Sequence, residues 1–249
     1  MKIAIFGGTG LIGRRLASRL QVLGHEVVAA ARSAGADTIS GRGIAEAISD
    51  ADVAVDVSNS SYGDVDGMRR YSALSTANLL AAAQLAGVGH YVALSAIGAD
   101  FINSGYFKAK RLQEKLIMGG SIPYTIVRSA PFFEFIYRYV DAGREVGRVC
   151  VPPISMQPVA ADDVAESLSH IVCNRPAQGV FEIAGPDRYD LADLALKILA
   201  ANEEKREVVV DPDVRYLGAH FAGEVLTGAR QRFASTRFDD WLHDWFAFQ

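Results

Sequence analysis

The chain has 249 residues, of which 50% are hydrophobic and 22% are charged, and its formal net charge is −4. This composition is typical of a soluble globular protein, and without a basic stripe we expect no nucleic-acid partner. Neither the two cysteines, Cys150 and Cys173, nor the five scattered histidines have metal-ligand spacing, so no disulfide framework or zinc site is expected. No apolar run reaches the ~18 residues of a membrane span, so we predict a soluble cytoplasmic protein.

The first 31 residues predict a strand, a glycine-rich turn, a helix and a second strand. The apolar run Ile3–Phe6 ends at Gly7–Gly10, and after it leucines recur at helical spacing over Leu11–Leu23. Gly24 is placed to end this helix, and Val27–Ala31 follows as a strand. These elements fit within ~30 residues, which is the size of one βαβ unit.

The same alternation continues to residue 128. Further strands are predicted over 52–57, 90–94 and 124–127, and further helices over 43–49, 66–86 and 106–118. Strands that alternate with helices are typical of a parallel sheet covered on both faces. We therefore predict an α/β fold with a doubly wound parallel Rossmann sheet.

The pattern changes after Arg128. An aromatic segment occupies 132–137, and Asp162 is expected to cap a helix that runs to Cys173. We also expect a strand over 180–184, a helix capped by Asp190, a strand over 207–210, and a final helix whose Trp241 and Trp245 pack it onto the body of the protein. The prediction is a dinucleotide-binding core over 1–128, to which elements of 157–185 return, and a smaller substrate-covering lobe over 129–249.

The glycines of the first turn follow a GxxGxxG pattern. In such a turn, one glycine allows the tight bend, one lets the backbone approach a pyrophosphate, and one lets helix and strand pack closely. The positive end of the helix dipole and its free N–H groups then face the phosphates. The position after a strand and before a helix is the context that this motif requires. We therefore expect a dinucleotide at Gly7, Thr9, Gly10, Leu11, Ile12 and Gly13.

The end of the second strand predicts which dinucleotide binds. NAD-binding proteins place an acidic residue about 20 residues after the glycines, where it holds the ribose hydroxyls. Here the chain has Ala31, Arg32 and Ser33 instead. Arg32 can pair with a 2′-phosphate and Ser33 can donate a second hydrogen bond, which favours NADP(H) over NAD(H). The alternative is that Arg32 is a solvated surface residue.

Several segments together resemble a known family. These are IAIFGGTGLIG, SGYFKAKRLQEKLI, PYTIVRSAPFFEF, QPVAADDVAESL, VFEIAGP and TRFDDWL. They are similar to the extended and atypical short-chain dehydrogenase/reductases, and most of all to the NmrA-like, NAD(P)H-binding branch. The resemblance covers nearly the whole chain and implies a Rossmann core of the tyrosine-dependent type.

The resemblance implies a catalytic pair. Active members of the superfamily use a Tyr-xxx-Lys pair in which the tyrosine exchanges a proton, and Tyr106 and Lys110 have this spacing. Side chains four residues apart lie on one face of a helix. We expect Lys110 to hold the nicotinamide ribose and its charge to lower the pKa of Tyr106. The alternative is a surface tyrosine and lysine that are four residues apart by chance.

Other active-site positions depart from the family pattern. Family members usually have two serines after the fourth core strand, whereas this chain has Ser95 and then Ala96. Ser95 is retained as a catalytic candidate, although successive strand residues point to opposite sides. The early asparagine of the long helix is replaced by Ser72, while Asn78 matches a later position. These differences weaken the case for carbonyl reduction and leave the case for cofactor binding intact.

Two more segments follow strands at the edge where such sheets bind ligands. Ser58 and Asn59 are expected beside the cofactor ribose, with a plain turn as the alternative. Pro131 lies in a segment that resembles the family's nicotinamide-flanking segment, and the phenylalanines that follow it are candidates for an apolar substrate wall or for lobe packing.

Two classes of function remain. The first, which we favour, is an NADP-dependent oxidoreductase that transfers a hydride between the nicotinamide and a small or medium carbonyl, quinone or enone. The second is a non-catalytic NADP(H)-binding redox sensor of NmrA type that acts through protein partners. A sugar-nucleotide epimerase is a weaker third hypothesis, because the second half lacks an evident basic cluster. The sequence leaves the substrate and the oligomeric state open.

Overall fold

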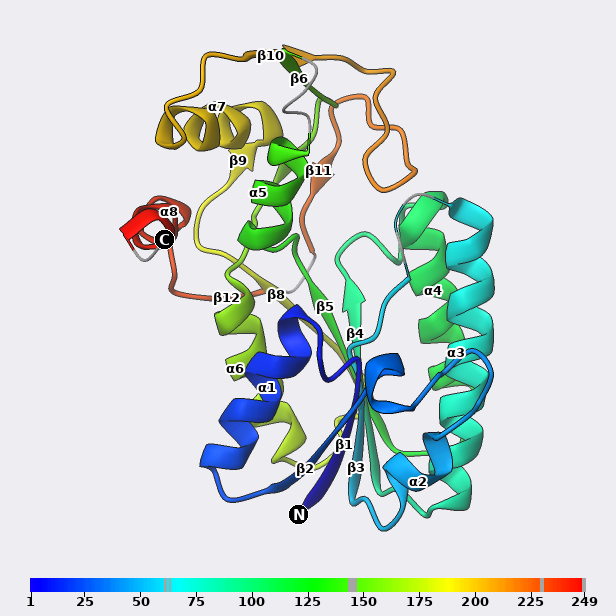
Figure 1. Cartoon of the computed structure of the whole chain (residues 1–249). Helices are drawn as coiled ribbons and strands as arrows, with labels where there is room; N and C mark the ends of the chain where they lie inside the picture. Colours follow the sequence, from blue (N-terminus) through cyan, green and yellow to red (C-terminus); the bar gives the residue numbers. More distant parts are fainter. Residues whose placement is uncertain (61, 63, 143–146, 229–230, 248–249) are drawn as a thin grey trace.

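The computed structural model describes residues 1–60, 62, 64–142, 147–228 and 231–247. Its centre is a seven-stranded sheet in which every neighbouring pair of strands is parallel (Figure 1). In sheet order the strands are β12 (Gln231–Phe233), β8 (Gly179–Ala184), β5 (Tyr124–Ser129), β4 (His90–Ala96), β3 (Val53–Asp56), β1 (Lys2–Phe6) and β2 (Glu26–Ala30). The predicted doubly wound parallel sheet is confirmed.

Helices cover both faces of this sheet (Figure 1). On one face lie α1 (Leu11–Val22) and α6 (Ala161–Val172), and on the other lie α2 (Ile44–Ile48), α3 (Val65–Leu85) and α4 (Gly105–Met118). The core is therefore divided by the sheet into two hydrophobic clusters. One cluster holds the α1 and α6 side together with much of the C-terminal part, and the other holds the α2 and α3 side.

Strand β1 shows why the chain forms a sheet that is buried on both faces. Ile3 and Ile5 belong to the first cluster, and Ala4 and Phe6 belong to the second. Successive side chains of a strand point to opposite faces, so an unbroken apolar run supplies both clusters at once. Strand β1 pairs with the edge strand β2 on one side and with β3 on the other, which places the turn after Phe6 at the carboxyl edge of the sheet, one strand in from its end.

The C-terminal part of the chain forms a lobe above the carboxyl ends of the strands (Figure 1). Strands β6 and β10 pair in parallel, while β7 pairs with both β9 and β11. The lobe's elements are α5 (Phe133–Asp141), β6 (Arg148–Val151), β7 (Ser155–Met156), β9 (Tyr189–Asp190), α7 (Leu191–Ala201), β10 (Glu207–Val210), β11 (Val225–Leu226) and α8 (Phe238–Ala247).

Lobe and core share segments. Strand β8 pairs with β5, and β12 in turn pairs with β8, so the chain returns to the central sheet twice after residue 129. The Trp241 ring lies 5.4 Å from that of Phe133 and Trp245 lies 5.5 Å from Tyr137, so α8 packs on α5 as expected. The division of the chain at residue 128 stays a prediction.

The expected cap at the start of α6 is wrong. The helix begins at Ala161, its N-cap is Ala160, and no side chain caps it. Asp162 instead forms an ion pair with Arg15 of α1, 3.1 Å away. The first N–H of the helix, that of Ala161, donates to the Glu134 carboxylate from α5. A partner from a distant segment therefore replaces the local cap that the sequence suggested.

None of the described helices combines the length and apolar character needed to cross a membrane.

Candidate functional site

A cavity of about 430 Å³ opens at the carboxyl edge of the sheet, between the core and the lobe. Most of its lining comes from strand ends and the turns after them, which is where ligands bind in open α/β sheets. Its lining includes Gly7, Thr9, Gly10, Leu11, Ile12, Arg32, Ser58, Asn59, Ser95, Tyr106, Lys110 and Pro131. Tertiary structure thus brings together nearly all of the residues that the sequence suggested.

The glycine turn is shaped by steric necessity. Gly7 has a positive φ of 83°, and a Cβ there would lie 2.8 Å from the backbone of Ser58. A Cβ on Gly13 would lie 2.2 Å from the Gly7 carbonyl oxygen, so glycine at this position allows the helix to pack against the turn. Gly13 itself does not belong to the cavity lining. Gly8 is a further requirement that the pattern missed, because its Cβ would lie 2.7 Å from Ala29.

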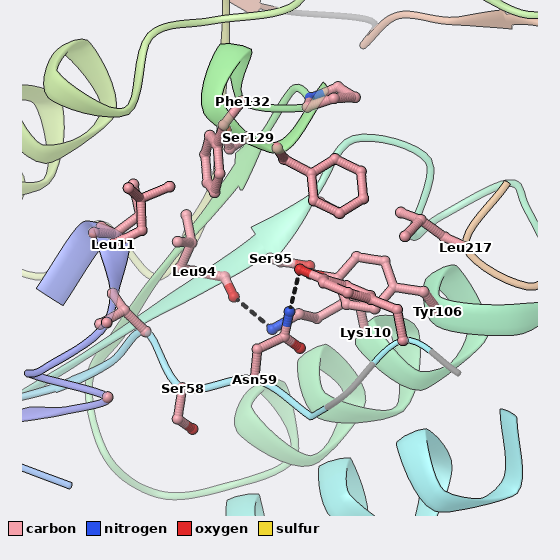
Figure 2. Close-up of a pocket in the computed structure, with 18 of the residues that line it drawn as sticks. Leu11, Ser58, Asn59, Leu94, Ser95, Tyr106, Lys110, Ser129, Phe132 and Leu217 are labelled. Carbon is pink, nitrogen blue, oxygen red and sulfur yellow. Dashed lines mark hydrogen bonds between the residues drawn. The ribbon is translucent and has the colours of Figure 1, made fainter. Parts of the chain in front are cut away.

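Helix α1 presents an uncapped N-terminus to the cavity. Its N-cap, Gly10, has no side chain, no side-chain hydrogen bond caps the helix, and its first turn carries no acidic residue. The backbone N–H groups of the first turn are therefore available for an anion, and the helix dipole favours one there. Leu11 and Ile12 of this turn line the cavity (Figure 2 labels Leu11). These features fit the pyrophosphate of a dinucleotide.

The end of β2 carries the cationic side chain that the NADP hypothesis requires. Arg32 is exposed, lines the cavity and opens a 3₁₀ turn over Arg32–Ala34. Glu134 is the acidic residue among the described residues that line the cavity, and it belongs to α5. No lining carboxylate therefore lies after β2, where NAD-binding proteins use one to hold the ribose hydroxyls. Ser33 is exposed but lies outside the cavity lining, so its predicted hydrogen bond has no geometric support here.

Next to Arg32 lie lining residues that sequence reasoning missed. Thr38 is buried and Tyr71 comes from α3, and both line the cavity. Asn78, about two helical turns further along α3, donates to the carbonyl oxygens of Thr38 and Ile39 at 2.9 Å each. Asn78 thus fixes this loop beside the cavity. In the sequence, Asn78 is an asparagine within a predicted helix, and this position alone does not predict which residues it binds.

The loop after β3 is held by Asp56. The Asp56 carboxylate accepts hydrogen bonds from the backbone N–H and the hydroxyl of Ser58, at 3.0 and 2.6 Å. Asn59 donates to the Tyr62 hydroxyl at 2.8 Å. Ser58 and Asn59 both line the cavity, as the ribose-binding hypothesis requires (Figure 2).

Lys110 lies at the centre of a buried polar network. Its ammonium group donates to the Leu94 carbonyl oxygen, as Figure 2 shows, and to the Gln113 side chain, at 3.0 Å each. Gln113 in turn donates to Asp56 at 2.8 Å. A lysine has three donors, so one remains for a ligand. Burial lowers the pKa of Lys110, while the negative charges of Asp56 and Glu114 act in the opposite direction.

Tyr106 lies beside Lys110 on α4, and the Lys110 ammonium is 5.7 Å from the centre of the Tyr106 ring. Burial raises the pKa of Tyr106 well above its usual value, and the neighbouring Tyr62 raises it further. The expectation that Lys110 lowers this pKa is therefore wrong in this structure, because desolvation of the phenolate outweighs any attraction by a cation that also lies buried. The Tyr106 hydroxyl is accordingly protonated near pH 7.

Ser95 is buried, and its hydroxyl donates to Glu114 at 2.5 Å. Glu114 also accepts two hydrogen bonds from Arg128, at 2.9 and 2.7 Å, and Arg128 pairs with Asp100 as well. The interaction with Glu114 raises the pKa of Arg128. The Ser95 hydroxyl is thus part of a buried ion-pair network that joins β4 to α4, and this engagement counts against the catalytic role predicted for it.

The lobe side of the cavity is aromatic. Tyr62 contacts Tyr106 edge-to-face at 5.4 Å and Phe135 at 5.2 Å, so the ring of a core loop reaches a lobe helix. Further lining residues from the lobe and its approach are Pro131, Phe132, Glu134, Phe135, Arg138, Tyr216, Leu217 and Leu226. The phenylalanine segment was expected here, whereas Tyr62, Tyr216 and Leu226 carried no sequence signal.

A comparison of the sequence with protein-family models agrees with a dinucleotide site in this cavity. A family model described as NAD(P)H-binding matches residues 7–172, which include the glycine turn, Arg32 and the Tyr106–Lys110 pair. The family prediction made from the motifs is confirmed, and so is a nicotinamide dinucleotide as the cofactor.

Curated relatives are distant. The photosystem II assembly factor Ycf39 of Trieres chinensis is 23% identical over 225 residues, which are 84% of this chain and 63% of that protein. Ycf39 of Synechocystis is 25% identical over 174 residues, which are 64% of this chain and 51% of that protein. The chain thus spans between half and two thirds of the length of these relatives.

Solved structures share the fold. A dTDP-4-dehydrorhamnose reductase from Bacillus anthracis, in complex with NADP, has a TM-score of 0.73 at 14% identity, over 100% of this chain and 98% of that one. A UDP-glucose 4-epimerase from Thermus thermophilus, in complex with NAD, has a TM-score of 0.71 at 14% identity, over 98% and 93% of the two chains. At such identity the likeness concerns the fold.

Proposed function

Since the chain belongs to the NAD(P)H-binding family, we propose that it is an NADP-dependent reductase of a small or medium carbonyl, quinone or enone. The observation that carries the proposal is the placement of Tyr106 and Lys110 on the cavity that the glycine turn opens into. When bound, NADPH supplies a hydride and its electron pair to the substrate and is oxidised to NADP⁺. The protein's residues bind the cofactor, position the substrate and supply the proton.

Lys110 is proposed to bind the cofactor and to orient it. Two of its donors are fixed on Leu94 and Gln113, so the third is directed by the protein and is suited to a ribose hydroxyl. Gln113 is itself held by its hydrogen bond to Asp56, and both residues are buried. This hydrogen bond helps to keep the Lys110 ammonium in its orientation. Preorganised donors of this kind cost little reorganisation when the ligand arrives.

Tyr106 supplies the proton. Its raised pKa keeps the hydroxyl protonated through neutral pH, so it can donate to a carbonyl oxygen as negative charge develops there. The O–H bond of Tyr106 then breaks, a new O–H bond forms on the substrate, and solvent reprotonates the phenolate after release. The aromatic lining beside Tyr106 excludes water and favours an apolar substrate.

Arg32 supports NADP over NAD. It follows β2, where a 2′-phosphate would lie in this fold, and its side chain is exposed, while its charge also acts on the Asp37 carboxylate. A guanidinium group pairs well with a phosphate, and Arg32 is the charged residue at this end of the described lining.

A second candidate function rests on one observation. The Ser95 hydroxyl is bound to Glu114 and the next residue is Ala96, so neither offers a hydroxyl to a substrate carbonyl. A protein that only binds NADP(H) and reports its redox state to a partner protein would need no such hydroxyl. The curated relatives named as photosystem II assembly factors are compatible with a role of that kind.

NADPH oxidation by the purified protein separates the two functions. The substrate panel contains quinones, aldehydes and ketones, and the variant is Tyr106→Phe. We expect turnover with at least one substrate and a loss of about 100-fold in kcat for the variant, since general acid catalysis contributes ~10²–10⁴-fold. Dissociation constants for NADPH should agree between the two proteins within about twofold.

Tyr124→Phe is the matched control, because Tyr124 begins β5 at the opposite end of the sheet from the cavity. Its kcat should equal that of the parent protein. Tight NADPH binding without turnover on any substrate would reject the reductase and leave the redox-sensor function.

A further inference from the structure

The charged side chains of the described cavity lining are Arg32, Lys110, Glu134 and Arg138. Lys110 and Glu134 are buried and held by hydrogen bonds within the protein. Arg32 and Arg138 are exposed, so a ligand in the cavity can reach both of them. The proposed function gives Arg32 the 2′-phosphate of the cofactor and leaves Arg138 without a role.

Helix α5, which rises from the carboxyl edge of the sheet into the lobe, places Arg138 on its cavity face (Figure 1). Glu134, Phe135 and Arg138 all line the cavity, and residues three and four apart share one face of a helix. The other face of α5 is apolar, with Ile136 and Val140 buried in the hydrophobic core. The packing of the apolar face therefore fixes which side of the helix carries the guanidinium group.

The charge of Arg138 is not neutralised by its neighbours on α5. Glu134 lies four residues earlier, but one oxygen of its carboxylate accepts from Arg15 at 3.3 Å and the other from the N–H of Ala161 at 3.2 Å. Within the part of the chain that the structure describes, no residue forms an ion pair with Arg138 or a hydrogen bond with its guanidinium group. A guanidinium group in this state is suited to an anionic ligand.

Arg138 belongs to the lobe side of the cavity, where the substrate is expected. Phe135, three residues earlier on the same helix, lies 5.2 Å from the ring of Tyr62, which in turn lies 5.4 Å from the ring of Tyr106. A row of rings therefore leads from Tyr106 to the turn of α5 that carries Arg138. Arg32 instead follows β2 of the core. The two exposed arginines thus belong to different walls of the cavity.

We propose that Arg138 is a specificity residue that binds a carboxylate of the substrate, and that the substrate is an aromatic carbonyl compound with this acid group remote from the carbonyl. The inference rests on the proposed reductase function, in which Tyr106 protonates the carbonyl oxygen. The rings of Tyr62 and Phe135 contact the aromatic body between the two groups. A single guanidinium group matches the one charge of a carboxylate, whereas a phosphate monoester brings nearly two charges.

Binding to the protein saturated with NADP⁺ tests the inference without turnover. The probes are 4-acetylbenzoate and 4′-acetylbiphenyl-4-carboxylate, which differ in length, each compared with its primary carboxamide. The amide keeps the rings and the ketone and removes only the charge. We expect the parent protein to bind at least one acid about tenfold more tightly than its amide, because the hydrogen bond to the carboxylate is charge-assisted. This preference should shrink between about 0.05 and 0.5 M NaCl, since an ion pair open to solvent is screened.

Arg138→Gln should weaken binding of the acid about tenfold and binding of the amide by less than about twofold. Arg138→Lys keeps the charge without the planar fork and should retain part of the preference. Arg148→Gln is the matched control, because Arg148 is exposed on β6 of the lobe and outside the cavity lining, and it should change neither affinity. The NADP⁺ dissociation constant of each variant reports whether the cofactor half is intact.

The experiment also separates binding from a purely structural role. Arg138 lies in the last turn of α5, where a cation interacts favourably with the helix dipole. That role alone would lower the free energy of unfolding of Arg138→Gln and leave the ratio of acid to amide affinity unchanged.

The inference is overturned if the parent protein prefers neither acid to its amide, if Arg138→Gln keeps the preference, or if none of the four compounds binds. A loss of NADP⁺ affinity in Arg138→Gln as large as the loss of acid affinity would also overturn it, since Arg138 would then bind the cofactor. Failure of the reductase function has a different signature. There an acid would still bind in preference to its amide and depend on Arg138, while NADPH oxidation would not occur.

Discussion

The two halves of the cavity are built in different ways. The cofactor half is made of strand ends and turns of the core, and Gly7, Gly8 and Gly13 are required there because an added Cβ would lie less than 3 Å from backbone atoms. The substrate half is made of aromatic side chains from α5, the β10–β11 loop and the loop after β3. Rigid backbone suits a ligand common to a whole family, whereas side chains on a lobe can change without disturbing the sheet.

The difference predicts that substitutions in the cofactor half abolish binding, while those in the substrate half alter selectivity. The largest effect is expected for Gly13→Ala. The new Cβ would lie 2.2 Å from the Gly7 carbonyl oxygen and 2.7 Å from Gly8, and neither backbone atom can move aside. We expect a loss of about 3 kcal/mol in the free energy of unfolding and a loss of more than about 100-fold in NADPH affinity, measured by denaturation and titration.

Gly119→Ala is the control for this substitution, since Gly119 is exposed, has a negative φ at the end of α4, and an added Cβ would lie 3.3 Å from the nearest carbonyl oxygen. Normal NADPH binding by Gly13→Ala would show that the cofactor half is not rigid.

Lys110→Met should have the next largest effect. The substitution removes the ammonium and leaves the Leu94 carbonyl oxygen and Gln113 without their buried donor. We expect kcat/KM to fall about 100-fold, because cofactor orientation and substrate protonation are both disturbed. Lys115→Met, on the exposed side of the same helix, should leave kcat/KM unchanged. A full-rate Lys110→Met enzyme would remove Lys110 from the proposed site.

Arg32→Ala tests the choice of cofactor within the cofactor half. We expect NADPH affinity to fall about tenfold and NADH affinity by less than about twofold, since only NADPH carries the 2′-phosphate. Isothermal titration with each dinucleotide measures both effects. The exposed Arg42→Ala variant should change neither. Equal losses for the two dinucleotides would contradict the phosphate contact.

Phe135→Leu tests the independence of the substrate half. Phe135 contacts Tyr62 and Tyr216 and lies on the lobe, so we expect KM for the substrate to rise about fivefold while NADPH affinity stays unchanged. Phe101→Leu, at an exposed phenylalanine outside the lining, serves as the control. A parallel loss of NADPH affinity would show that the two halves form one unit.

The smallest expected effect is the pH dependence. A lysine is charged below its pKa, and burial lowers the pKa of Lys110, so its charge is lost at a lower pH than that of an exposed lysine. NADPH affinity should therefore decrease by about threefold between pH 7 and 10 in the parent protein. The decrease should be absent in Lys110→Met. Tyr106 contributes nothing over most of this range, because its raised pKa keeps it protonated.

The cofactor half could be predicted from the sequence because its signals are local. An apolar run, a glycine at a sharp turn and leucines at helical spacing all lie within about 30 residues, and backbone sterics allow few alternatives. The Tyr106–Lys110 spacing is likewise local, because one helical turn places the two side chains on one face. Only contacts with distant residues escaped this reasoning, as with Gly8 against Ala29 and Asn78 against the Thr38 loop.

The substrate half and the electrostatics were decided by the tertiary structure. Tyr216 contacts Phe135 and lines the same cavity as Tyr106 only because the lobe folds back over the sheet, and no periodicity in the sequence encodes that arrangement. The pKa of Tyr106 depends on how deeply packing buries it, and burial prevailed over the nearby lysine. The sequence by itself determined the parallel sheet, the glycine turn and the spacing of the pair, since these follow from local sterics and periodicity. Which hydroxyls and charges are free to act was decided by the packing of distant segments, because desolvation and hydrogen-bond partners exist only in the folded chain.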